Sequence, residues 1–191
     1  MNLRERRRRQ TARDIQTAAV TVALRNGFDQ MTTEAIAHEA GISTRTFFNY
    51  YNNKQAAILG AAVRIDVEAA GWFTCSDGAL IDDIAKLLGQ RLQDDPLERA
   101  VLRKIMAVVD ANPSLQDLFR KKVHETSLSL ATLLEVRLGG ERAIESRLLA
   151  ELATHALTEA VVIWAADEDS ALDEISVLVA AKLRSVREIL S

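Results

Sequence analysis

The stretch from Thr32 to Lys54 constrains the fold of this 191-residue chain more than any other segment. Its pattern predicts two short helices joined by a tight turn at Gly41, because glycine enters the left-handed region without a steric cost. Thr32 or Thr33 is expected to cap the first helix and Ser43 the second, since a side-chain hydroxyl can accept a hydrogen bond from an otherwise unpaired helix N–H. The sequence therefore predicts a helical hairpin with a sharply defined turn.

Each of the two predicted helices has an apolar face at helical spacing. The residues of these faces and of the turn are Ile36, Ala37, Ala40, Ile42, Phe47, Tyr50 and Tyr51. The other face of the second helix is mostly polar and consists of Thr44, Arg45, Phe48 and Asn49. A short polar face that starts with an arginine is typical of a helix-turn-helix whose second helix enters the DNA major groove.

The run from Gly27 to Leu59 resembles the DNA-binding domain of the tetracycline-repressor (TetR) family of bacterial regulators. The residues that match the usual family pattern are Thr32, Ile36, Ala37, Ala40, Gly41, Ser43, Thr46, Tyr50 and Lys54. Ile42, Phe47 and Tyr51 are replacements that largely conserve volume. Phe48 is a stronger departure, because the family tyrosine at this position usually gives its hydroxyl to a phosphate and phenylalanine cannot.

The residues that we expect to contact DNA lie within and around this motif. Arg45 is the side chain able to bind guanine O6 and N7 together, with Thr44 and Asn49 as further contacts to base edges. The expected phosphate contacts are Thr33, Ser43, Thr46, Tyr50 and Lys54, and Phe48 completes the candidate surface. For Lys54 the expectation also rests on its place near a helix N-terminus, which favours an anion.

The charge of the chain is divided between its two ends. Residues 1–58 contain nine Arg or Lys and five Asp or Glu, so this segment carries +4 and the remainder −7 of the net −3. A basic end on an acidic body suits a nucleic-acid binder in which only one end faces phosphate. The run Arg6–Arg9 is expected to lack fixed structure without DNA, and it is either a solubilising extension or an arm for the minor groove or phosphates.

The remaining pattern predicts helices only, so the fold class is all-α. A first helix is expected from about Thr11 to Asn26, where it closes a three-helix core, and a fourth from Lys54 to about Ala70, capped by Asn53. Further helices are expected at about 79–92, after Asp94-Asp95-Pro96, and at about 113–138, 144–166 and 172–190. Residues 1–52 would form the helix-turn-helix domain, and residues 53–191 a helical domain for dimerisation and ligand sensing.

The last two predicted helices have apolar patterns wider than one buried stripe needs. We therefore expect them to pack against the same helices of a second subunit, in an isologous four-helix bundle. A charge placed at Leu157 or Leu183 is expected to make the protein monomeric or insoluble.

A cavity for a small-molecule effector is expected in the helical domain. The candidate lining residues are Trp72, Phe73, Met106, Phe119, His124 and Trp164, since aromatic side chains with a few polar groups suit such cavities. Each of them can equally be plain core. The long fourth helix is the expected lever between this cavity and the DNA contacts.

Enzyme chemistry has little support in the sequence. The chain has no Gly-rich phosphate loop, no Gly-x-Ser-x-Gly and no His-Glu-x-x-His, and no cofactor is expected. His155 and Glu159 lie four residues apart, which offers two metal ligands or, more simply, a hydrogen bond, and we expect no metal site. The lone Cys75, the absence of an apolar run of about 20 residues and the lack of a signal sequence favour a cytoplasmic protein that does not enter the membrane.

The TetR-family resemblance implies a dimeric repressor that releases a palindromic operator when it binds a small-molecule effector. Two other classes of protein fit part of the pattern. An enzyme or carrier can use the helical cavity, and a DNA-packaging protein can bind duplex DNA without preference for its sequence.

Overall fold

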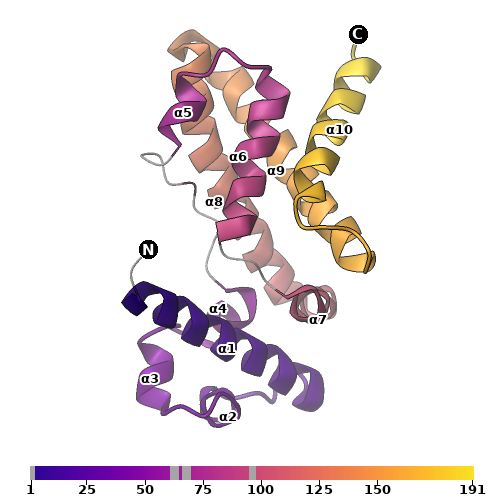
Figure 1. Cartoon of the computed structure of the whole chain (residues 1–191). Coiled ribbons are helices and arrows are strands. Elements are labelled where there is room, and N and C mark those ends of the chain that lie inside the picture. Colours follow the sequence, from indigo (N-terminus) through magenta and orange to yellow (C-terminus); the bar gives the residue numbers. More distant parts are fainter. Residues whose placement is uncertain (1–2, 61–64, 66–69, 95–97) are drawn as a thin grey trace. The chain divides into compact units, whose positions relative to one another are not determined.

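The computed structural model describes residues 3–60, 65, 70–94 and 98–191. The described elements are α1 (Leu3–Asn26), α2 (Thr33–Glu39), α3 (Thr44–Phe48), α4 (Lys54–Leu59), α5 (Gly71–Thr74), α6 (Leu80–Asp94), α7 (Arg99–Asp110), α8 (Pro113–Leu138), the short 3-10 helix η1 (Gly140–Arg142), α9 (Ala143–Ala166) and α10 (Glu174–Ile189) (Figure 1). No β-strand occurs within these ranges. The predicted all-α fold class is confirmed.

Internal contacts divide the chain into two compact units. The first unit comprises residues 1–61 and 97–119, and the second comprises residues 62–96 and 120–191. The division falls within α8, so this helix contributes residues to both units. α7 and the first turns of α8 therefore belong with the N-terminal helices, which was not expected from the sequence.

The core of the first unit forms around one face of α1, against which α2, α4 and α7 pack. Its fully buried side chains include Ile15 of α1, Ile36 of α2 and Phe47 of α3. Ile42 is half-buried against the same cluster. The predicted three-helix core is therefore confirmed, and Leu115 of α8 is a member of it that the sequence analysis did not assign.

Side-chain caps define the starts of the short helices, as the sequence predicted. The cap is Thr32 for α2, Ser43 for α3 and Asn53 for α4. In each case the side-chain oxygen accepts a hydrogen bond, of 2.7–3.1 Å, from the backbone N–H three residues further on. Gly41 has a φ of 67° in the turn between α2 and α3, the left-handed conformation that the turn requires.

The first predicted helix was too short. α1 begins at Leu3 rather than about Thr11, and the run Arg6–Arg9, which we expected to lack fixed structure, is helical. Pairs of side chains four residues apart support these first turns, since Arg9 lies 2.9 Å from Glu5 in an ion pair. A search for apolar periodicity misses such a segment, because its stabilising contacts are polar and lie along the helix surface.

The fourth predicted helix was too long. α4 ends at Leu59, where Gly60 adopts φ 68° and ψ −168°, a conformation essentially restricted to glycine. The buried Gln16 of α1 donates from Nε2 to the backbone oxygen of Ile58 at 2.9 Å. A Cβ at position 60 would lie 2.6 Å from this Nε2, so a larger residue would strain the backbone and also displace the Gln16 side chain. Residues 61–64 and 66–69, over which we expected the helix to continue, lie outside the described residues.

In the second unit α10 packs against both α9 and α6 (Figure 1). Fully buried side chains from α6 and α8 include Ile84, Leu88, Leu130 and Leu134. Gly139, with φ 92°, ends α8, as the Gly139-Gly140 pair predicted. The predicted limits of α6, α8, α9 and α10 agree with the structure to within about two residues.

The segment Gly140–Ala166, which contains η1 and α9, is long and apolar enough to cross a bilayer, with a mean hydropathy of 1.4. An apolar segment of this length was not expected from the sequence. In the fold, 44% of its most apolar window is buried. A single helix of this kind is weak evidence for a membrane span, because a core helix of a soluble protein meets the same criteria.

A largely buried ion pair joins α8 to α6. Nη2 of Arg137 lies 2.7 Å from Oδ2 of Asp83 and donates a further hydrogen bond to the backbone oxygen of Gly78 at 2.8 Å. Ser76 donates to the same carboxylate at 2.7 Å. Burial opposes ionisation of Asp83, but the hydrogen bonds from Ser76 and Arg137 and the nearby positive charges outweigh it, so the pKa of Asp83 lies below its usual 3.8.

We predict that Asp83→Asn lowers the free energy of unfolding by about 3 kcal/mol at pH 7, because the Arg137 guanidinium loses its buried counter-charge. The pKa of Asp83 is lower in the folded state than in the unfolded state. The stabilisation is therefore present above about pH 4 and is lost as pH falls through the folded-state pKa.

Urea unfolding at pH 7 and pH 3 measures this difference, with the exposed Asp77→Asn as the control. An Asp83→Asn protein as stable as the unaltered one at pH 7 would show that the ion pair contributes no net stability.

Candidate nucleic-acid interface

The position of α3 is fixed by two aromatic side chains on its inner side. Phe47 is fully buried and Tyr51 is 8% exposed, with ring centroids 6.3 Å apart. The hydroxyl of Tyr51 donates to the backbone oxygen of Ala12 in α1 at 3.1 Å. Because the inner side of α3 is anchored to α1 in this way, the direction of its outer side is determined.

The outer side of α3 carries the candidates for base contacts. Arg45 and Asn49 are exposed, and within the described residues neither side chain forms a hydrogen bond or ion pair. Phe48 is 51% exposed, and its ring meets Phe47 edge to face at 5.4 Å between centroids. Thr44 is half-buried at the start of the helix. The structure thus brings together the four residues that the sequence assigned to this face.

The hydroxyl candidates for phosphate contacts are partly engaged within the protein. The hydroxyls of Ser43 and Thr46 lie 2.8 Å apart at the start of α3. Thr33 donates to the carboxylate of Glu34 at 3.3 Å, and Tyr50 is half-buried. A hydrogen bond from its own backbone N–H holds the pKa of Glu34 below its usual 4.5, so a negative charge sits at the start of α2.

Lys54 lies in an environment that the sequence analysis did not predict. Its Nζ donates to the backbone oxygens of Phe28, Asp29 and Met31, at 2.9, 3.1 and 3.1 Å. The same Nζ lies 4.8 Å from the centre of the Phe28 ring. The ammonium group that we assigned to a phosphate is thus bound by the turn between α1 and α2.

The six effector candidates are spread over both units. Met106 and Phe119 are half-buried in the first unit. In the second, Trp72 is half-buried with Lys86 Nζ 4.7 Å from its ring, and Phe73 is buried beneath Arg137.

The other two candidates also lie in the second unit. Trp164 is 7% exposed in α9. His124 is exposed, with Nδ1 2.7 Å from Oε1 of Glu151. None of the six candidates lines either of the two grooves described below.

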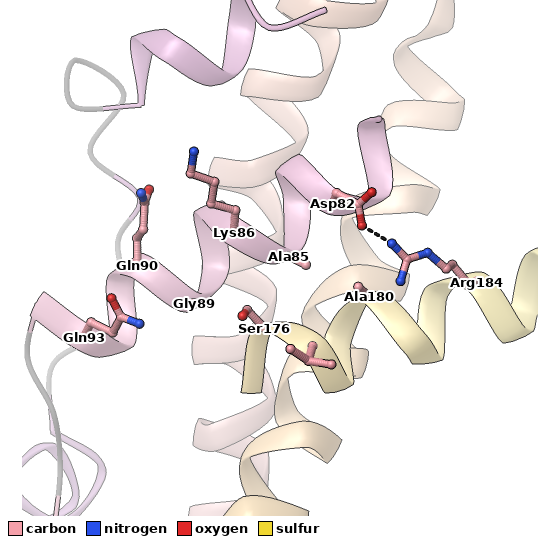
Figure 2. Close-up of a pocket in the computed structure, with 10 residues that line it drawn as sticks. Asp82, Ala85, Lys86, Gly89, Gln90, Gln93, Ser176, Ala180 and Arg184 are labelled. Carbon is pink, nitrogen blue, oxygen red and sulfur yellow. Dashed lines mark hydrogen bonds and ion pairs between the residues drawn. The ribbon is translucent and has the colours of Figure 1, made fainter. Parts of the chain in front are cut away.

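A groove of about 440 Å³ between α6 and α10 was not foreseen (Figure 2). Its polar side chains are Lys86, Gln90 and Gln93 of α6, Ser176 and Arg184 of α10, and Asp82, which pairs with Arg184. Gly89 of α6 lets the two helices approach closely here: a Cβ added to Gly89 would lie 2.9 Å from the Cβ of Ser176 in α10. The sequence feature that could have indicated this groove is the row of polar residues at positions 82, 86, 90 and 93, which share one face of a helix.

A second groove, of about 320 Å³, lies between α9 and α10. Its lining includes Leu152, Ala156 and Val186, with His155 and Glu159 among the polar members. Within the described part of the chain, no group of three or more His, Cys, Asp or Glu residues is placed to hold a metal ion.

Comparison with known proteins agrees with this geometry. The family described as bacterial regulatory proteins, tetR family, matches residues 15–61. The chain has the fold of Salmonella enterica GusR, with a TM-score of 0.52, 20% identity, and 94% of this chain and 96% of that one covered. It is also similar to EbrR, titled a multidrug binding protein and solved with imidazole, with a TM-score of 0.50, 17% identity, and coverage of 92% and 94%.

A comparison with curated proteins gives no match. The likeness to solved structures shows the overall fold, and the family match covers the helix-turn-helix together with the C-terminal half of α1. Residues 15–61 therefore match a domain of the bacterial regulatory proteins of the tetR family, and the solved structures show that the rest of the chain has the corresponding fold.

Proposed function

We propose that this protein is a dimeric repressor that binds a palindromic operator through α3 and releases it when a small molecule binds the helical body. The observation that carries the proposal is the exposed side of α3, where Arg45 and Asn49 have no partner among the described residues. In functional terms residues 1–52 serve DNA binding, and residues 53–191 serve dimerisation and effector binding in the cytoplasm.

The exposed side chains of α3 have the chemistry needed to distinguish bases. Arg45 is suited to guanine O6 and N7, and Asn49 to adenine N6 and N7. Phe48 offers an apolar surface to a thymine methyl group, which compensates for its lack of a hydroxyl. Thr44, Ser43, Thr46, Tyr50 and Thr33 surround these residues as candidates for backbone contacts that position the helix.

We predict that Arg45→Ala weakens binding to the preferred duplex by about 1–3 kcal/mol and relaxes base preference at one position in each half-site. Selection of bound duplexes from a random pool, repeated with each variant, measures both effects. The exposed Arg187→Ala in α10 changes the net charge equally and serves as the control.

An Arg45→Ala protein with unchanged base preference would remove Arg45 from the interface. An unaltered protein that binds random and selected duplexes equally would favour the DNA-packaging alternative over an operator-binding repressor.

The face that we propose for dimerisation lies on α9. Its exposed apolar side chains are Ile144, Leu148, Leu152 and Ile163, and the groove between α9 and α10 continues it. Leu157 and Leu183, which we expected at the interface, are only 7% and 3% exposed within their own chain. They are therefore core residues of the subunit and cannot form much of a dimer interface. A charge at either position would disrupt the core of the subunit before it affected a dimer.

We predict that Leu148→Glu gives a folded monomer, because Leu148 is 66% exposed and a carboxylate there would be buried unpaired in a symmetric interface. Val136→Glu is the matched control, since Val136 is equally exposed but lies on α8. Light scattering at micromolar concentration gives the mass, and circular dichroism shows whether each variant is folded. An unaltered protein that is monomeric under these conditions would exclude the proposed dimer.

The proposal also assigns effector binding to the helical body. The family's helical body and the similarity to EbrR, titled a multidrug binding protein, support a ligand role for the second unit. We expected one long helix from Lys54 to about Ala70 to transmit effector binding to the DNA contacts. α4 ends at Leu59, so it does not provide that long helix. The candidate residues for the effector remain Trp72, Phe73, His124 and Trp164 in the second unit, with Met106 and Phe119 in the first.

We predict that an effector found by screening compounds against the protein–duplex complex weakens DNA binding by about 5–150-fold, and that DNA weakens effector binding by the same factor. Trp72→Ala is expected to reduce the effector response and to leave duplex affinity unchanged. Calorimetric titration of the effector with and without the selected duplex provides the measurement. Equal effector affinities in the two titrations would show that the ligand site is not coupled to DNA.

A further inference from the structure

The ammonium group of Lys54 is surrounded by acceptors from a single turn. Three backbone oxygens, of Phe28, Asp29 and Met31, lie 2.9–3.1 Å from Nζ. All three belong to the segment between the end of α1 at Asn26 and the start of α2 at Thr33. The ring of Phe28 adds a cation–π contact at 4.8 Å to the same charge.

We propose that Lys54 is a positioning residue of the DNA-binding site, which binds the turn between α1 and α2 and does not contact a phosphate. The proposal rests on the DNA-binding function proposed above. It replaces the phosphate contact that the sequence suggested for this lysine.

The hydrogen-bonding capacity of the side chain supports this role. A lysine ammonium has three N–H donors and no more, and three carbonyl oxygens use all of them. A phosphate would therefore have to displace at least one of these bonds. The three carbonyl oxygens and the face of the Phe28 ring also stabilise the ammonium where it lies, so moving it to a phosphate would forfeit these contacts.

The position of Lys54 in the motif explains why this contact matters for DNA binding. Met31, one of the acceptors, directly precedes the α2 cap Thr32, and its side chain is 2% exposed. Lys54 itself directly follows the α4 cap Asn53 and lies five residues after Asn49 of the recognition surface. The side chain therefore ties the entrance of the helix-turn-helix to its exit, and so holds α2 and α3 in one arrangement.

Two substitutions separate positioning from phosphate binding. Lys54→Arg keeps the charge, but a planar guanidinium cannot direct three donors to oxygens that converge on one point. Lys54→Met keeps the apolar stem and removes the charge. If Lys54 binds a phosphate, Lys54→Arg binds DNA like the unaltered protein, and Lys54→Met lowers the slope of log affinity against log salt by about 0.9.

If Lys54 positions the motif, both variants bind the duplex selected by the unaltered protein about tenfold more weakly or worse, the factor for one hydrogen bond to a charged group. The salt slope then stays unchanged in both. Affinities are compared at a temperature where circular dichroism shows every variant folded. Lys104→Met on α7, an exposed lysine in the same unit, is the control for loss of one positive charge.

Hydrogen exchange without DNA supplies a second readout. The amide of Ile36 donates to the backbone oxygen of Thr32 in the first turn of α2 at 3.1 Å, and that of Tyr51 donates to Phe47 at 2.9 Å. We expect faster exchange at Ile36 in both Lys54 variants and unchanged exchange at Tyr51. This readout tests the positioning role even if no duplex is bound selectively, an outcome that would instead reject the proposed operator binding.

The proposal is overturned by unaltered affinity and exchange in Lys54→Arg, or by a salt slope that falls by about one in Lys54→Met.

Discussion

The burial of one face of α1 is the constraint on which the N-terminal unit depends. Ile15, Ala19 and Val22 are fully buried along this face, and the small alanines allow α2, α4 and α7 to approach closely. Two hydrogen bonds to α1 then set the positions of the neighbouring elements. The Gln16 side chain donates to the last turn of α4, and the backbone oxygen of Ala12 accepts from the hydroxyl of Tyr51. The outward direction of α3 is a consequence of these contacts with α1.

Much of this arrangement was predictable because it is determined by local chemistry. The caps Thr32, Ser43 and Asn53, the positive φ of Gly41 and the buried face around Phe47 depend on residues a few positions apart. The errors have different causes. Apolar periodicity continues past Leu59, but it does not report the backbone angles of the next glycine or the side chain of α1 that fills the space beside it.

The candidate site shows the same limit. The composition of the outer face of α3 follows from helical spacing, and the structure brings its members together. The partners of Lys54 were not predictable, because they are backbone oxygens 23–26 positions earlier in the chain. Every residue has such an oxygen, so the residue types do not indicate which ones are used. Nor does a wide apolar pattern say which part is covered by the same chain, so Leu157 and Leu148 looked alike although one is 7% and the other 66% exposed.

The positive charge of the N-terminal segment is concentrated on α1. The net +4 of residues 1–58 comes mainly from arginines, since Lys54 is the one lysine among the nine basic residues of this segment. Most of them lie in the first turns of α1, where Arg6, Arg7 and Arg8 are exposed on a helix and not on a loose tail. A helix already orders the backbone of these residues, so binding would order only their side chains. Under the proposed function, long-range attraction to phosphates would come mainly from the arginines of α1, and reading of bases from α3, two helices that share one core.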